Sequence, residues 1–225
     1  MWIKICGNTN LEDALFAAEN GADALGFVFA EGPRRVTVEQ VAEITPHLPA
    51  RVQTYGVFVD AGFDAIVTAV LECNLTGVQI SIASPMGPDL ALPRRLKSYF
   101  ADAIAGAPLQ ILCALHYSAD LSGQLAEVHR STDYDAVLID SHTAKAFGGT
   151  GISYDWQAAS EVFCRHSDLN LIAAGGLTPE NVTEAISTLR PWGVDVVTGV
   201  EAFPGKKDHA KVRAFIQNAR SASRP

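Results

Sequence analysis

Short apolar runs rich in β-branched residues recur along the whole chain and alternate with longer segments of helical spacing. Runs of this length are typical of strands that are buried on both faces, as in a parallel sheet. We therefore expect strands at residues 2–5, 24–29, 52–59, 77–80, 109–114, 136–139, 171–174 and 194–198.

The segments between these runs carry apolar residues three and four positions apart, for example in residues 11–18 and 212–219. This spacing predicts amphipathic helices that bury one face. Asn10 and Thr37 precede two of these segments, and both residue types are favourable N-caps.

Eight strands that alternate with helices predict an α/β fold with right-handed crossovers between parallel strands. We expect a single (β/α)8 TIM barrel with a parallel eight-stranded core, and an open doubly wound sheet is the alternative. The length of 225 residues suits one barrel, and no shift in composition marks a boundary. One domain is therefore expected over residues 1–225.

Composition excludes several classes of function. The net charge of −8 argues against nucleic-acid binding, although backbone N–H groups can bind a phosphate without a basic excess. No run approaches the length of a membrane span, and we expect no secretion signal, because residues 2–5 already have a strand pattern. We expect a protein with a small-molecule ligand, no nucleic-acid partner and no membrane partner.

Cysteine and histidine spacing argues against a metal centre. The four cysteines lie far apart without a CxxC pair, and the six histidines show no paired-ligand spacing. Reduced thiols are typical of a cytoplasmic protein, which is the location we expect. We predict neither a metal nor a cofactor.

In a TIM barrel, catalytic groups lie at the carboxyl ends of the strands and in the loops that follow. Cys6 follows the first expected strand, where a thiolate can act as a general base. Asp140 follows the sixth, where a desolvated carboxyl can act as a general acid. A buried structural thiol and a hydrogen-bonding carboxylate are the alternatives for these two residues.

Glycines after the seventh and eighth strands predict a phosphate site. Gly175, Gly176 and Gly199 lie in the two loops that form the usual phosphate site of this fold, and glycine allows backbone N–H groups to approach the anion. The pair Arg34 and Arg35 follows the second strand and offers a guanidinium for a carboxylate or phosphate. Ordinary turns and solvated arginines are the alternatives.

Two other segments have simpler interpretations. Residues 147–151, with three glycines, are similar to a mobile lid, although a plain connection has the same composition. Lys206 and Lys207 are expected at the start of the last helix, in solvent.

Motifs over nearly the whole chain resemble the phosphoribosylanthranilate isomerase family of tryptophan biosynthesis. The most specific are KICG at residues 4–7 and GVEAFPGKKD at residues 199–208. The other matching segments are residues 8–14, 21–29, 56–59, 138–140, 147–151, 154–156 and 174–182.

The resemblance implies an Amadori rearrangement of N-(5′-phosphoribosyl)anthranilate to 1-(2-carboxyphenylamino)-1-deoxyribulose 5-phosphate without a cofactor. It implies Asp140 as the general acid that opens the ribose ring and Cys6 as the general base that removes the C2′ proton. It places Arg35 near the anthranilate carboxylate, and Gly175, Gly176 and Gly199 around the phosphate.

Two strand ends depart from the family pattern. The fourth strand continues as Ser81-Ile82-Ala83 where the family has a histidine and a glycine, and the fifth lacks a lysine near Ala114. A related sugar isomerase of histidine biosynthesis and a non-catalytic phosphate-binding barrel therefore remain as alternatives. The oligomeric state, monomer or homodimer, also remains open.

Overall fold

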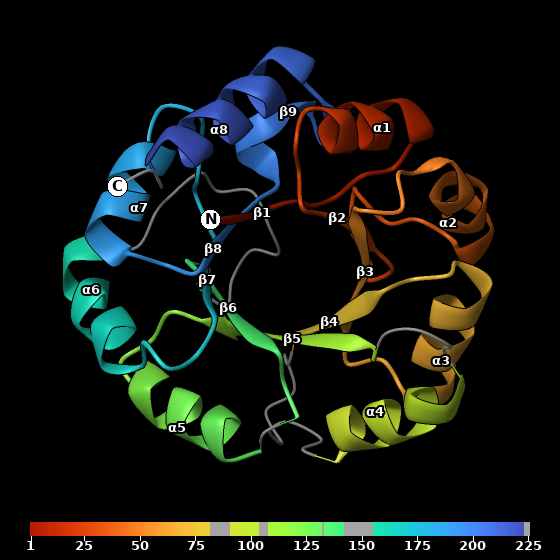
Figure 1. The fold of residues 1–225 in the computed structure, drawn as a ribbon, viewed down its shortest axis with the longest axis horizontal. Helices are drawn as coiled ribbons and strands as arrows, with labels where there is room; N and C mark the ends of the chain where they lie inside the picture. The colour runs from red at the N-terminus through yellow and green to blue at the C-terminus, as the bar shows by residue number, and fades with distance from the viewer. Residues whose placement is uncertain (82–90, 104–107, 132, 142–154, 223–225) are drawn as a thin grey trace.

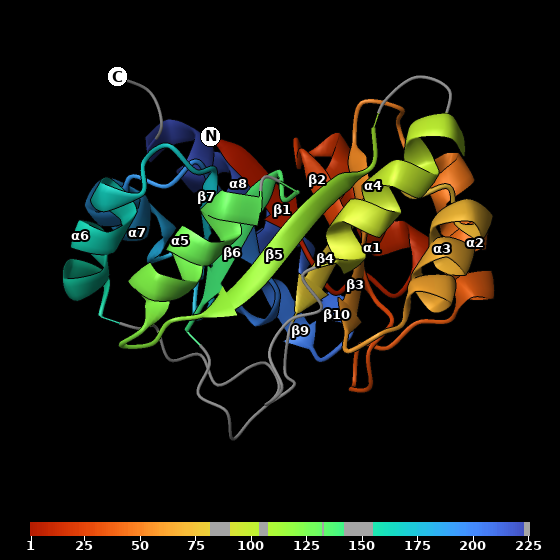
Figure 2. The ribbon, with the colours of Figure 1, turned by 90° about the horizontal axis from the view of Figure 1, so that it is seen from below.

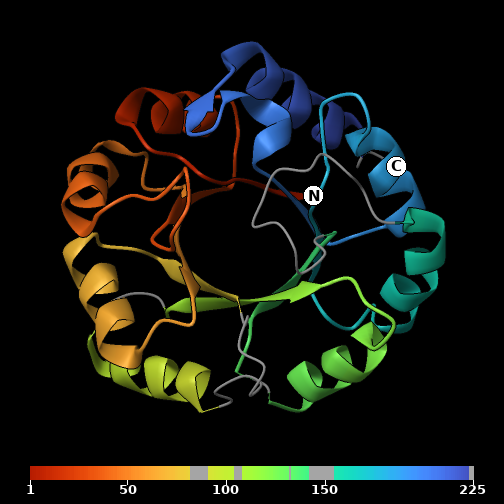
Figure 3. The same ribbon diagram turned by 180° about the vertical axis from the view of Figure 1, so that it is seen from behind.

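Eight parallel strands close into a barrel in the computed structural model, which describes residues 1–81, 91–103, 108–131, 133–141 and 155–222. The strands pair in chain order, and the last pairs back with the first. Helices surround the strands in both end views (Figures 1 and 3). The predicted TIM barrel is confirmed, and the open sheet is wrong.

The elements follow the predicted alternation. The strands are β1 (Trp2–Ile5), β2 (Ala24–Val28), β3 (Gln53–Val59), β4 (Gly77–Ser81), β5 (Gln110–His116), β6 (Ala136–Asp140), β7 (Leu171–Ala173) and β8 (Gly193–Val196). The helices are α1 (Leu11–Glu19), α2 (Val38–Ile44), α3 (Phe63–Glu72), α4 (Leu92–Ala103), α5 (Leu121–Ser131), α6 (Trp156–Arg165), α7 (Val182–Leu189) and α8 (His209–Ala222). None of the helices in the described ranges has the length and apolar character needed to span a lipid bilayer.

The predicted N-caps are confirmed. The side chain of Asn10 accepts a hydrogen bond from the Asp13 backbone N–H at the start of α1. Thr37 forms a capping box with Gln40 at the start of α2. Backbone N–H groups at the starts of α1 and α2 therefore have side-chain acceptors.

The chain after β8 differs from the prediction. The expected strand at 194–198 stops at Val196, and a 3₁₀ turn, η2 (Thr198–Val200), follows. Next comes a small antiparallel hairpin of β9 (Glu201–Phe203) and β10 (Lys206–Lys207), with a register shift between its last two residues. The two lysines therefore lie on a strand before α8, and their expected place at the start of that helix is wrong.

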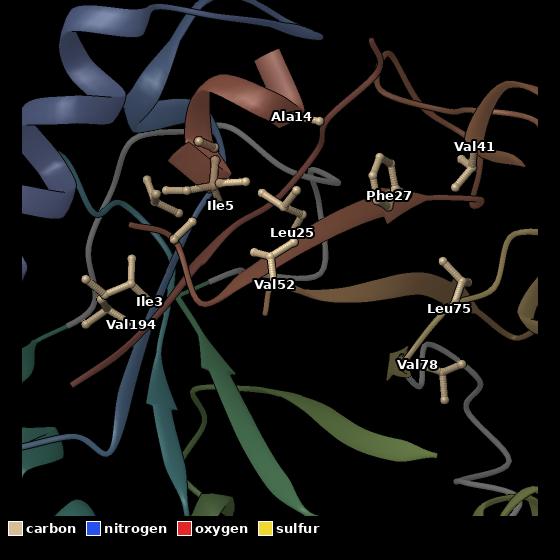
Figure 4. Packing of buried hydrophobic residues seen from close by; sticks show 14 of the residues in the cluster. Ile3, Ile5, Ala14, Leu25, Phe27, Val41, Val52, Leu75, Val78 and Val194 are labelled. Carbon is tan, nitrogen blue, oxygen red and sulfur yellow. The ribbon is translucent and has the colours of Figure 1, made fainter. Parts of the chain in front are cut away.

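Side chains alternate between two core layers. Ile3 and Ile5 of β1 face the helices, where Figure 4 shows Ile3 beside its register partner Val194. The barrel interior holds a second cluster, which consists of Ala24, Tyr55, Leu112, Ala114, Ala136, Leu138, Ile172 and Ala174, with Trp2 packed against it. Each strand thus buries both of its faces, as the apolar runs predicted.

The hairpin and α8 are joined to α1 by one buried carboxylate. Asp13 accepts hydrogen bonds from the Lys206 ammonium at 2.8 Å and the Lys207 backbone N–H at 2.9 Å, and its Oδ1 lies 2.9 Å from His209 Nε2. Burial alone would raise the pKa of Asp13, but these hydrogen bonds lower it to about 2. Figure 2 shows the hairpin at the end of the barrel opposite to the chain termini.

Asp13→Asn should therefore make the protein less stable at neutral pH by about 2 kcal/mol, since a pKa lowered from 3.8 to about 2 stabilises the folded state above the unfolded pKa. This contribution is lost as the pH falls from about 4 to 2. Urea unfolding across this range measures it. Asp64→Asn, in the exposed first turn of α3, is the matched control. Equal pH dependence in wild type and Asp13→Asn would contradict the assignment.

Candidate active site

Cys6 lies directly after β1, at the carboxyl end of the barrel. Its backbone N–H donates to the Val196 carbonyl at 2.9 Å, which continues the β1–β8 ladder by one residue. The residue is 3% exposed, and its sulfur fills the space that Gly26 leaves on β2, where a Cβ would lie 2.5 Å from Sγ. The neighbouring glycine thus sets the position of the thiol.

A buried lysine lies beneath this thiol, on the same face of β1. Lys4 Nζ donates to Asp195 Oδ1 at 2.8 Å and to Gln79 Oε1 at 2.9 Å. These two hydrogen bonds connect β1 to β8 and to β4 inside the barrel. Burial lowers the pKa of Lys4, but attraction to Asp195 and to the Cys6 sulfur, together with hydrogen bonding to Asp195, raises it above its ordinary value. The ammonium is therefore charged at neutral pH.

The pKa of Cys6 lies above the ordinary thiol value. Burial is the main cause, because a thiolate is costly to desolvate, and Asp195 acts in the same direction. The positive charge of Lys4 opposes this shift. In the free protein the thiol form therefore predominates at neutral pH.

A second ionic cluster fixes the turn after Cys6. Arg34 Nε and Nη2 donate to the two carboxylate oxygens of Glu201 at 2.8 and 2.7 Å. Lys207 Nζ donates to the Cys6 carbonyl at 2.6 Å and lies 3.5 Å from Glu201 Oε1. Burial lowers the pKa of Lys207, and its side chain is 0% exposed, so the expectation that it is solvated is wrong.

Asp140 ends β6 at the same end of the barrel as Cys6, because all eight strands run parallel in one closed sheet. It follows Ala136 and Leu138 at alternate positions, and these two side chains belong to the interior cluster. Gly175 lies against it, since a Cβ on this glycine would be 2.5 Å from Asp140 Oδ1. The carboxyl therefore projects into the mouth of the barrel.

The three predicted phosphate-site glycines come together. Gly175 and Gly176 have φ angles of +78° and +67°, a region that favours glycine, and η2 places Gly199 against the same loop. A Cβ on Gly199 would lie 1.9 Å from the Leu177 carbonyl oxygen. Asn181 donates to the Gly176 carbonyl at 2.9 Å and fixes this loop. Such packed glycine turns can hold backbone N–H groups around an anion.

The two arginines after β2 have different environments. Arg34 is buried against Glu201 and the Gly7 turn, whereas the side chain of Arg35 is 53% exposed and pairs with Glu31. Arg35 is thus accessible to a ligand, whereas the guanidinium of Arg34 is used in the buried ion pair with Glu201. The predicted lid, residues 147–151, lies outside the described residues.

The altered strand ends both lie at this mouth. β4 ends with Ser81, and β5 extends to His116, which is the register partner of Asp140 on β6. Leu112 and Ala114 face the interior, so alternation places His116 on the same side as Asp140. The mouth therefore carries a hydroxyl and an imidazole at the strand ends that depart from the expected pattern.

Sequence reasoning missed the buried polar and ionic groups around Cys6. They are Lys4, Gln79, Asp195, Arg34 as a structural cation, Glu201 and Lys207. The available signal was a charged residue in the middle of an apolar strand, as in residues 2–5 and 193–196, because a buried charge requires a partner.

Comparisons with known proteins agree on one family. The family described as N-(5′phosphoribosyl)anthranilate (PRA) isomerase matches residues 3–218. An N-(5′-phosphoribosyl)anthranilate isomerase from Geobacter sulfurreducens is 42% identical, over 97% of this chain and 98% of its own.

Solved structures agree as well. A phosphoribosyl anthranilate isomerase from Thermotoga maritima has a TM-score of 0.82 at 36% identity, over 98% of this chain and 99% of its own. Another, in complex with reduced 1-(o-carboxyphenylamino)-1-deoxyribulose 5-phosphate, has a TM-score of 0.79 at 35% identity, with the same coverage of 98% and 99%.

The packing of Cys6 against β2 can be tested by Gly26→Ala. The added Cβ would overlap the sulfur, so we expect a loss of about 1–3 kcal/mol in the free energy of unfolding, typical of overpacked cores. Gly62→Ala is the control, because a Cβ there meets nothing within 4 Å, and it should change stability by less than about 1 kcal/mol. Equal effects of the two substitutions would contradict the packing.

Proposed function

This chain belongs to the N-(5′-phosphoribosyl)anthranilate isomerase family, and we propose that it catalyses the Amadori rearrangement of N-(5′-phosphoribosyl)anthranilate in tryptophan biosynthesis. The product is 1-(2-carboxyphenylamino)-1-deoxyribulose 5-phosphate. The placement of Cys6 and Asp140 at one end of the barrel, beside the loop of Gly175 and Gly176 against which Gly199 packs, supports the assignment of roles.

The reaction requires one proton to be donated to the ring oxygen and another to be removed from C2′, and both of these atoms are bonded to C1′. We assign to Asp140 the protonation of the ribose ring oxygen, which opens the ring to a Schiff base. Cys6 then removes the proton from C2′, and the resulting enolamine tautomerises to the ketone. A positioned acid and base each contribute about 10²–10⁴-fold to such a step.

The remaining groups bind the two anionic ends of the substrate. Backbone N–H groups around Gly175, Gly176 and Gly199 are suited to the phosphate. Such binding needs no excess of basic side chains, so it is compatible with the net charge of −8. Arg35 is suited to the anthranilate carboxylate, for which it would exchange its pairing with Glu31. No metal or cofactor is needed in this mechanism.

The identity over the full length of the relatives favours this reaction over that of the histidine-pathway sugar isomerases. We also propose a cytoplasmic location, because the four cysteines, all within the described residues, are free thiols, as is usual in reducing compartments.

Cys6→Ala and Asp140→Asn should each lower kcat by roughly 10²-fold or more, since each removes one proton transfer. Turnover is followed by loss of the fluorescence of the anthranilate substrate. Cys164→Ala, at an exposed cysteine of α6, is the control and should retain full activity. A loss below about threefold for Cys6→Ala would show that the thiol is structural. A folded wild-type protein without turnover would overturn the function and leave a non-catalytic barrel.

Arg35→Met should raise KM about tenfold or more while kcat changes little, since binding of the carboxylate is equal in the ground and transition states. Glu31→Gln removes the competing carboxylate, so it should leave KM equal to or below that of the wild type. A KM for Arg35→Met equal to that of the wild type would remove the arginine from the site.

A further inference from the structure

The end of the Lys4 side chain and the sulfur of Cys6 are packed against one point of β2. A Cβ on Gly26 would lie 2.5 Å from Cys6 Sγ and 3.1 Å from Lys4 Cε, so the end of the lysine side chain adjoins the sulfur. The ammonium has three N–H donors, and Asp195 and Gln79 accept from two of them. Its positive charge also lowers the pKa of the nearby Cys6 thiol, against the effect of burial.

Stability of the barrel does not account for this buried ion pair. The cluster that fills the barrel interior is apolar, although Gln79 also pairs with Lys4, and a buried ion pair contributes little to stability compared with apolar side chains of similar volume. The pair does hold a positive charge at a fixed place, because Lys4 and Asp195 are register partners on adjacent strands.

Other charged groups face Cys6 from β8, β10 and the turn after β2, namely Asp195, Lys207 and Arg34. Lys207 donates to the carbonyl of Cys6 and Arg34 is bound by both oxygens of Glu201. Asp195 opposes ionisation of the thiol, but less strongly than Lys4 favours it. Lys4 is thus the main cation acting on the sulfur.

We propose that Lys4 is a positioning residue for the general base: held by Asp195 and Gln79, its ammonium faces the sulfur of Cys6 and stabilises the thiolate that takes the C2′ proton. The inference rests on the role proposed for Cys6. Lys4 does not touch the substrate, since it lies beneath the thiol with a side chain that is 0% exposed. Its effect is on the fraction of Cys6 that is ionised.

The direct test is a pH titration of the thiolate by its ultraviolet absorbance, with the matching Cys6→Ala variant subtracted in each background. Lys4→Met should raise the midpoint by about one pH unit or more, which is a tenfold smaller thiolate fraction at a given pH. Lys4→Arg keeps the charge and should restore most of the difference. Lys97→Met, a part-buried lysine that pairs with Asp135 on the outer surface, is the control and should leave the midpoint unchanged.

If Lys4→Met does not fold because Asp195 is left unpaired, the double variant Lys4→Met/Asp195→Asn removes both charges. Its midpoint should still exceed that of the wild type, by less than for Lys4→Met alone. A midpoint equal to or below the wild-type value in the folded variant would overturn the proposal. The titration does not require turnover, so it is separate from the activity test: an inactive wild type whose midpoint depends on Lys4 would overturn only the proposed function.

In the active enzyme, Lys4→Met should lower kcat about tenfold, in proportion to the lost thiolate, and leave KM nearly unchanged. The pH profile of kcat should move by the same amount as the titration. A higher KM with an unshifted profile would indicate a purely structural lysine and contradict the proposal.

Discussion

Pairing of β1 with β8 closes the barrel, and the geometry of the site depends on this contact. It brings residues 2–6 beside residues 193–196, at opposite ends of the chain, and the ladder continues one residue beyond β1 through the Cys6 N–H. The same register places Lys4 opposite Asp195, so closure and the ion pair beneath the thiol are parts of one arrangement. Without closure, Lys4 would lose its anionic partner Asp195, which also acts on Cys6.

The segment after β8 fixes the mouth from outside the barrel. The hairpin of β9 and β10 contributes Glu201 and Lys207, and these bind Arg34 from the turn after β2 and the carbonyl of Cys6. The backbone of the hairpin also binds Asp13 on α1. The loops after β1 and β2 are thereby held by residues from the C-terminal part of the chain, which limits the movement of the thiol.

The charge distribution within the mouth is uneven. Ionic groups surround Cys6 on the side of β1, β8 and β10, whereas Asp140 lies beside glycine turns on β7 and next to His116 on β5. A base with a nearby cation and an acid in a different environment are suited to opposite proton transfers. The histidine at the altered end of β5 is the register partner of Asp140, whereas Ser81 ends β4, the strand whose Gln79 accepts a hydrogen bond from Lys4.

The amino-acid sequence by itself determined the order of strands and helices, the caps at Asn10 and Thr37, and the strand-end positions of Cys6 and Asp140 and of the glycine turns after β7 and β8. These follow from local periodicity and turn chemistry, which depend on residues within a few positions of one another. Only the tertiary structure decided that Lys4 pairs with Asp195, that Lys207 is buried on a hairpin, and that Arg34 rather than Arg35 is bound within the protein. The contacts that bury Lys4, Lys207 and Arg34 include partners more than 160 residues away, as the Lys4–Asp195, Lys207–Cys6 and Arg34–Glu201 contacts show, and a local pattern does not identify such partners.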